Sequence, residues 1–134
     1  MPAMGPVRIK MFENAEVFYS YTRKQALEDG VLLDVTQVAA EAGFKYPVAV
    51  TKRLWDEVVT PDDESKEYGQ SEEGRLWDVL WMCMIAAKYS KGSEIKFQLY
   101  VQNGGRERLI SLKAVCHSGD EAEPVITIMM PEED

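Results

Sequence analysis

The sequence predicts an α+β domain in which a three-stranded antiparallel meander, about residues 94–130, packs on a long apolar helix, about residues 71–90. The helix is indicated by the almost unbroken apolar run GRLWDVLWMCMIAAKYS, which begins at Gly74. The first strand is indicated by strict alternation of apolar and polar residues over 94–101. An Asn-Gly-Gly turn follows, whose residues accept the positive φ angles of a hairpin. The third strand is expected over residues 125–130 (VITIMM).

The chain is predicted to form a single domain over residues 1–134, because 46% hydrophobic residues supply enough apolar surface for a core. Two prolines and a glycine lie near the start of the chain without a clear periodicity. We therefore expect residues 1–16 to form an irregular arm.

Short N-terminal helices and a short strand are expected after the arm. Thr22 has a suitable side chain to cap a helix over RKQALED, and Gly30 suits the left-handed position that ends it. Residues 31–35 (VLLDV) then form a short strand, and Thr36 caps a second helix, QVAAEA.

Residues 47–50 (PVAV) follow Tyr46, which the proline pushes toward extended geometry. They lead into a third helix, KRLWDEVV, which Thr51 caps. The next stretch, residues 60–73, holds six acidic residues against one lysine and has no apolar periodicity. It is predicted to be a solvated loop.

The long helix carries the expected signals at both ends. Ser71 is its N-cap, Glu72 and Glu73 lie in its first turn, and Lys88 lies near its end, where each charge is favourable for the helix dipole. A helix that is apolar on this many sides must be covered on more than one, so we expect the sheet on one side and the short helices on the other. A narrow polar line is left for solvent: Ser71, Arg75, Asp78 and Tyr89.

The sequence leaves two registers open for the hairpin. A turn centred on residues 103–104 places Glu94 opposite Lys113, whereas a turn centred one residue later pairs Phe97 with Leu112. Both registers keep the apolar faces of the two strands together, so side-chain pattern does not choose between them.

Charge and length exclude two kinds of partner. The formal net charge of -8 repels a phosphate backbone, so direct binding of nucleic acid is not expected. The apolar run over residues 76–87 includes Asp78 and is shorter than the roughly 20 residues that a membrane span requires. Cys83 and Cys116 lie in apolar runs rather than in a close ligand motif, which is typical of a reduced, cytoplasmic protein.

No catalytic residue, metal site or cofactor is predicted. His117 is the only histidine, and a zinc site would require Cys83 and Cys116 to converge with carboxylates. Cys116 and His117 are adjacent on a predicted strand, so their side chains point to opposite faces and do not form a nucleophile and base pair.

Two groups of residues are candidates for binding. The first is a set of aromatic residues that would line a pocket for a flat or apolar ligand: Trp55, Trp77, Trp81 and Tyr46. The helical spacing of the last two tryptophans favours packing in the core instead. The second is a set of acidic residues in the loop that would contact a partner: Asp62, Asp63, Glu64 and Glu67. Together with the acidic tail over residues 120–134 they would form a decoy for a DNA-binding protein, although solvation is the simpler interpretation.

Five segments resemble a family of small bacterial proteins of unknown function: YTRKQALEDGVLLDVT (21–36), GFKYPVAVT (43–51), GRLWDVLWM (74–82), EIKFQLYV (94–101) and EPVITIMMPEED (123–134). Such proteins look like passengers of plasmids, phages and other mobile elements. The resemblance implies no site residues. It favours an accessory or host-defence-inhibiting role over housekeeping metabolism, by association alone.

These observations favour a non-enzymatic, cytoplasmic interaction or accessory domain of mobile-element origin that binds a protein partner. The first alternative is a small enzyme or ligand-binding protein with a pocket between the sheet and the Trp-rich helix. The second is an acidic DNA mimic that inhibits a nucleic-acid-binding protein of the host.

Overall fold

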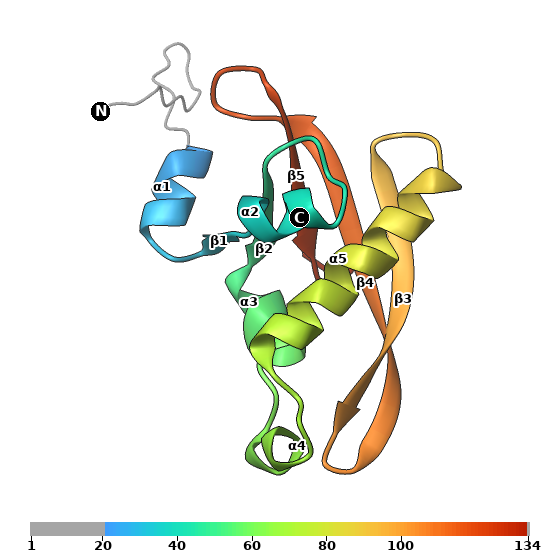
Figure 1. Ribbon diagram of the computed structural model, residues 1–134. Coiled ribbons are helices and arrows are strands. Elements are labelled where there is room, and N and C mark those ends of the chain that lie inside the picture. The colour runs from blue at the N-terminus through green and yellow to red at the C-terminus, as the bar shows by residue number, and fades with distance from the viewer. Residues whose placement is uncertain (1–20, 134) are drawn as a thin grey trace.

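The computed structural model describes residues 21–133, which form an α+β fold, as predicted (Figure 1). The helical elements are α1 (Arg23–Glu28), α2 (Thr36–Glu41), α3 (Lys52–Leu54), the π-helical η1 (Trp55–Val59), α4 (Asp63–Glu67) and α5 (Glu72–Lys88). The strands are β1 (Leu32–Asp34), β2 (Val48–Thr51), β3 (Glu94–Asn103), β4 (Arg106–Ser118) and β5 (Pro124–Met129). The arm predicted over residues 1–16 lies outside the described residues.

The sheet has five strands in the order β1-β2-β5-β4-β3, which corrects the predicted three-stranded meander. β2 and β5 are parallel, and every other neighbouring pair is antiparallel. The difference comes from residues 48–51, which were expected only as an extended lead-in to a helix. They pair with β5, placing Val48 beside Ile126. Such a short segment carries no local signal of a parallel partner so far away in the sequence.

The hairpin between β3 and β4 adopts the second of the two registers, with Phe97 opposite Leu112. Gly104 and Gly105 form its turn with φ angles of 57° and 73°. Positive φ at both central residues is typical of the type I′ turn, whose twist matches that of the flanking strands. The two glycines therefore fix the register that the alternating side chains leave open.

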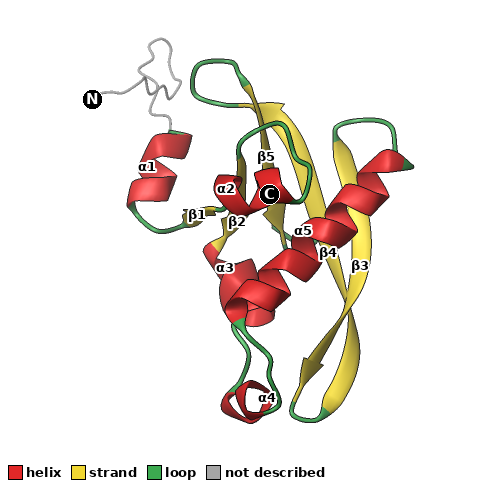
Figure 2. Ribbon diagram, viewed as in Figure 1, coloured by secondary structure: helices red, strands yellow, loops and turns green. Residues whose placement is uncertain are grey.

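Helices α2 and α5 cover one face of the sheet (Figure 2), and the π-helical η1 packs against α5. On α5 the buried hydrophobic residues are Leu76, Val79, Leu80 and Cys83, and they belong to the same core cluster as Val50, Leu112 and Ile128 of the sheet. The long helix therefore buries one stripe against the sheet and the shorter helical elements.

Two expectations for α5 are wrong. The sequence pattern predicts that Arg75 faces solvent, but its side chain is buried, with 3% exposed. Trp77 and Trp81 were favoured as core residues, but they are 37% and 45% exposed. The sheet ends at β3, and among residues 21–133 no further strand continues it beyond that edge, so this side of the helix is only partly covered.

The acidic segment before α5 is not a plain loop, because it contains α4. Asp62 caps this helix by accepting a hydrogen bond from the backbone N–H of Ser65 at 2.8 Å. Ser65 is buried and donates its hydroxyl to the carbonyl of Gln102 at 3.2 Å. The short helix is therefore attached to the end of β3.

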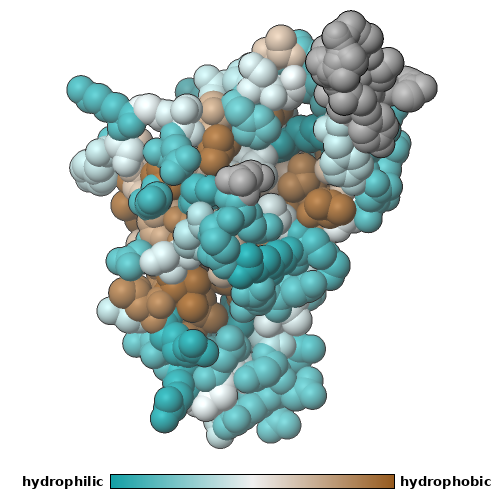
Figure 3. Space-filling model, turned by 180° about the vertical axis from the view of Figure 1, so that it is seen from behind, coloured by the Kyte–Doolittle hydropathy of each residue, from teal (hydrophilic) through white to brown (hydrophobic). Residues whose placement is uncertain are grey.

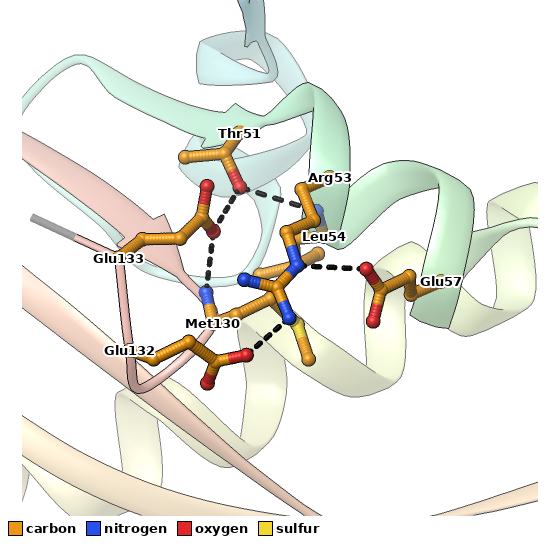
Figure 4. Close-up of polar contacts among 7 residues, drawn as sticks. All are labelled: Thr51, Arg53, Leu54, Glu57, Met130, Glu132 and Glu133. Atoms are coloured by element: carbon orange, nitrogen blue, oxygen red, sulfur yellow. Dashed lines mark hydrogen bonds and ion pairs between the residues drawn. The ribbon is translucent and has the colours of Figure 1, made fainter.

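The C-terminal residues are attached to the start of α3 (Figure 4). The Glu133 carboxylate accepts hydrogen bonds from the Thr51 hydroxyl and the Met130 N–H, both at 2.8 Å. Arg53 forms ion pairs with Glu57 and Glu132. Two acids of the tail therefore have partners within the chain.

Candidate functional site

The most exposed aromatic feature of α5 is a pair of stacked indole rings. The ring centroids of Trp77 and Trp81 lie 6.1 Å apart and their planes are inclined by 12°. Exposing two large rings to water is unfavourable, and exposed apolar groups that cluster are common at binding surfaces. The pair therefore marks a candidate surface for a ligand or a partner.

The other two predicted aromatic residues lie elsewhere. Trp55 is half-buried on η1, donates its indole N–H to Glu72 at 3.3 Å, and lines a separate hollow beside α2. Tyr46 lies in the loop before β2 and is 46% exposed. The structure therefore brings together two of the four residues predicted as a pocket, and it does not place Trp55 in the same hollow as Trp81.

Beside the tryptophan pair, a groove runs between α5 and β3. It consists of two hollows of about 180 and 260 Å³ that share Asp78, Leu99 and Tyr100. The smaller hollow is also lined by Arg75, Gln102 and Glu107, and the larger one by Trp81, Met82, Gln98 and Leu109. We refer to these lining residues, with Trp77, as the Trp groove.

One border of the Trp groove is apolar and open to solvent. Tyr100 is 63% exposed and Leu109 is 50% exposed, and they lie directly opposite each other on β3 and β4. In the view from behind, one of the hydrophobic patches lies toward the β3–β4 side of the molecule (Figure 3). The groove thus continues around the edge of the sheet as an apolar surface.

Arg75 closes one end of the groove. Its guanidinium donates to the carbonyl of Gln102, to the side-chain oxygen of Asn103 at 2.7 Å and to the carbonyl of Val58 at 3.3 Å. It also reaches Gln70 at 3.3 Å. Burial lowers the pKa of Arg75, and the charges of nearby carboxylates oppose this shift. All of these hydrogen-bond acceptors are neutral oxygens. Because most of them lie on η1 and at the end of β3, Arg75 links the start of α5 to both elements.

Asp78 is the carboxylate common to both hollows. Its side chain lies one turn after Arg75 on α5 and is exposed. Desolvation raises the pKa of Asp78, and the positive charge of Arg75 opposes the shift. Within residues 21–133 it makes no hydrogen bond and no ion pair within 4 Å, so this carboxylate of the groove has no partner among the described residues.

A second polar cluster, not predicted from the sequence, lies on the opposite face of the sheet. Arg23 donates to the hydroxyl of Thr127 at 2.7 Å and to the carbonyl of Ile126 at 3.0 Å. The Nε2 atom of His117 lies 2.9 Å from the same hydroxyl. Thr127 is only 5% exposed, and the carboxylate of Asp120 accepts from backbone N–H groups at the start of α1. This cluster attaches α1 to the sheet. The contact between His117 and Thr127 lies within the sheet, because His117 is a residue of β4.

The predicted acidic residues are divided between structural and exposed positions. Asp62 caps α4, and its hydrogen bonds with Ser65 lower its pKa. Asp63, Glu64 and Glu67 are exposed on α4. The 119–123 loop lies beyond the other end of β4, whose 13 residues span roughly 40 Å. This part of the acidic tail is therefore far from α4 (Figure 1), whereas Glu132 and Glu133 lie at the start of α3.

Neither a membrane span nor a metal site is found in the described part of the chain. Within residues 21–133, no helix is both long and apolar enough to cross a bilayer. The same residues contain no group of three or more His, Cys, Asp or Glu side chains placed to hold a metal ion.

The contribution of the Arg75 hydrogen bonds to stability can be measured by substitution. Replacing Arg75 by Met leaves buried oxygens without a donor, and each such group costs roughly 1–3 kcal/mol. We expect the free energy of unfolding, measured in urea, to fall by about 2 kcal/mol or more. Arg53→Met is the matched control, since it removes exposed ion pairs that contribute little. Equal losses in the two variants would contradict the role assigned to Arg75.

The two cysteines should differ in reactivity. Cys83 is buried, and burial raises its pKa to about 12, so almost no thiolate is present near neutral pH. Cys116 is only half-buried, although both cysteines lie in apolar runs of the sequence. In native Cys116→Ser protein, a thiol reagent should label Cys83 slowly from pH 7 to 9 and rapidly only after unfolding. Rapid labelling of the native variant would show that Cys83 is accessible.

Comparison with known proteins identifies the family without indicating an activity. No curated protein and no solved structure matches the chain. Residues 9–134 match the model of a family described as "Family of unknown function (DUF6573)". This match covers most of the sequence, so the chain belongs to the DUF6573 family.

Proposed function

We propose that this protein is a non-enzymatic interaction domain and that the Trp groove is its binding surface for another protein. The observation that carries this proposal is the stacked, exposed pair Trp77 and Trp81 beside an apolar groove. Tryptophan and tyrosine are enriched at the energetic centres of protein interfaces, because they bury a large area and lose little conformational entropy on binding.

The composition of the groove supports a protein partner over a small ligand. Its two hollows are shallow and shared between a helix and a strand edge, and its exposed border includes Tyr100 and Leu109. Small-molecule sites are usually deeper and enclose most of the ligand. A surface that mixes aromatic side chains with the carboxylates of Asp78 and Glu107 suits a polypeptide with both apolar and charged groups.

The cellular setting belongs to the same proposal. The segments that resemble proteins of plasmids, phages and other mobile elements support an accessory role, in which the bound protein belongs to the host. The placement of Cys83 in the core as a thiol fits a reducing, cytoplasmic location. An enzyme role is not proposed, because no arrangement of nucleophile, base and orienting group supports one in the described residues.

The test compares two sets of substitutions in capture experiments from a lysate of the source cells, with captured proteins identified by mass spectrometry. The groove variant is Trp77→Ser with Trp81→Ser. The acidic variant carries Asp63→Asn, Glu64→Gln and Glu67→Gln, which changes exposed carboxylates on α4. We expect the wild type and the acidic variant to capture the same protein and the groove variant to lose it.

Circular dichroism should show that both variants remain folded, because the changed side chains are exposed. Loss of capture only in the acidic variant, and only at low salt, would favour the acidic decoy instead. Capture that survives in the groove variant, or a wild type that captures no protein, would contradict the proposed function.

A further inference from the structure

Within residues 21–133, no strand pairs with the outer edge of β3, since only β4 pairs with this strand. The N–H of Cys116 donates to the carbonyl of Ser93, which makes the odd-numbered residues of β3 the ones that bond to β4. The even-numbered residues therefore direct their N–H and C=O groups outward, along the side where the Trp groove lies.

The described contacts show where this open edge ends. The carbonyl of Gln102 is one of the outward groups, and it already accepts hydrogen bonds from Arg75 and Ser65. From Glu94 to Tyr100 the outward groups have no such partners in the described part of the chain. The open edge is therefore about seven residues long, enough to pair with a strand of ordinary length.

The groove and the open edge follow the same part of β3. Gln98, Leu99 and Tyr100 line the larger hollow, and the outward backbone groups of Gln98 and Tyr100 lie on that edge. A strand added there would direct alternate side chains to opposite sides of the sheet. One set would enter the space bounded by Asp78 and Trp81, and the other would lie beside Tyr100.

The charges near the groove favour a positively charged occupant. The lining residues include two carboxylates, since Asp78 borders both hollows and Glu107 borders one, against the single guanidinium of Arg75, whose donors are already used by backbone and amide oxygens. The opposite charges of Glu94 and Lys96, both on β3, offset each other. The indole of Trp81 borders the same hollow as Asp78, so a guanidinium placed there would meet both a carboxylate and an aromatic face.

We propose that the Trp groove binds an extended basic segment of a partner protein, which pairs with the outer edge of β3 as a sixth strand and places an arginine or lysine between Asp78 and Trp81. This inference rests on the proposed function and specifies the chemistry of its partner. Main-chain hydrogen bonds to β3 supply a sequence-independent part of the affinity, and the pocket beside Asp78 selects the basic side chain.

The probes are synthetic nine-residue peptides of alternating valine and threonine with one central residue varied. The first carries arginine at the centre, the second glutamate, and the third arginine with N-methyl groups on three consecutive central residues, which removes strand-pairing donors. Binding to the full chain is measured by tryptophan fluorescence and by the protection of β3 amides in NMR. We expect the arginine peptide to bind about tenfold or more tightly than either of the others.

A matched pair of variants separates the effect of the Asp78 charge from the effect of strand pairing. Asp78→Asn should reduce the preference for arginine over glutamate to about twofold or less and leave β3 protection by the bound peptide in place. Glu73→Gln, which changes an exposed acid at the start of α5, should leave the preference unchanged. Equal binding of the N-methylated peptide, a preference for glutamate, or no binding of the arginine peptide would overturn the inference.

The outcomes distinguish this inference from the proposed function. If the lysate partner requires Trp77 and Trp81 while the peptides fail, the interaction surface stands and the basic strand is wrong. If light scattering shows a dimer that Trp81→Ser abolishes, the occupant of the edge is a second copy of the chain, which also overturns the basic segment.

Discussion

The buried guanidinium of Arg75 is the interaction on which the arrangement of the groove depends. It is 3% exposed and donates to oxygens from η1 and from the end of β3. A buried cation among neutral acceptors is stable only when its donors are well used, because desolvation is costly. Arg75 therefore sets the position of α5 relative to β3, and with it the spacing between Asp78 and the strand edge.

The edge itself follows from the topology of the sheet. β3 is the last strand, and the register set by Gly104 and Gly105 decides which of its backbone groups face outward. At one end of this edge, Ser65 of α4 and Arg75 share the carbonyl of Gln102. Natural sheets usually protect long exposed edges, so the edge that residues 21–133 leave open beside an aromatic groove supports the proposal that another chain pairs there.

The sequence predicts the parts of the fold that depend on local pattern. The cap at Ser71, the alternation along β3 and the turn at Gly104 are all visible in short windows. The pairing of β2 with β5 is not, because it joins distant short segments whose contact leaves no local period. For the site, helical spacing places Arg75 on a polar line and the tryptophans in the core. Both expectations fail, because the position of β3 relative to α5 decides which side of the helix is covered.

Binding of a partner strand requires an open edge of β3 beside the tryptophan pair, and hydrogen exchange of the β3 amides measures this openness most directly. In the free protein, the outward amides of Lys96, Gln98 and Tyr100 should exchange much faster than the inward amides of Phe97 and Leu99, which are bonded to β4. Alternation of fast and slow exchange along β3 is the predicted result. Uniformly slow exchange at all five amides would show that the edge is already paired, and it would contradict the central claim.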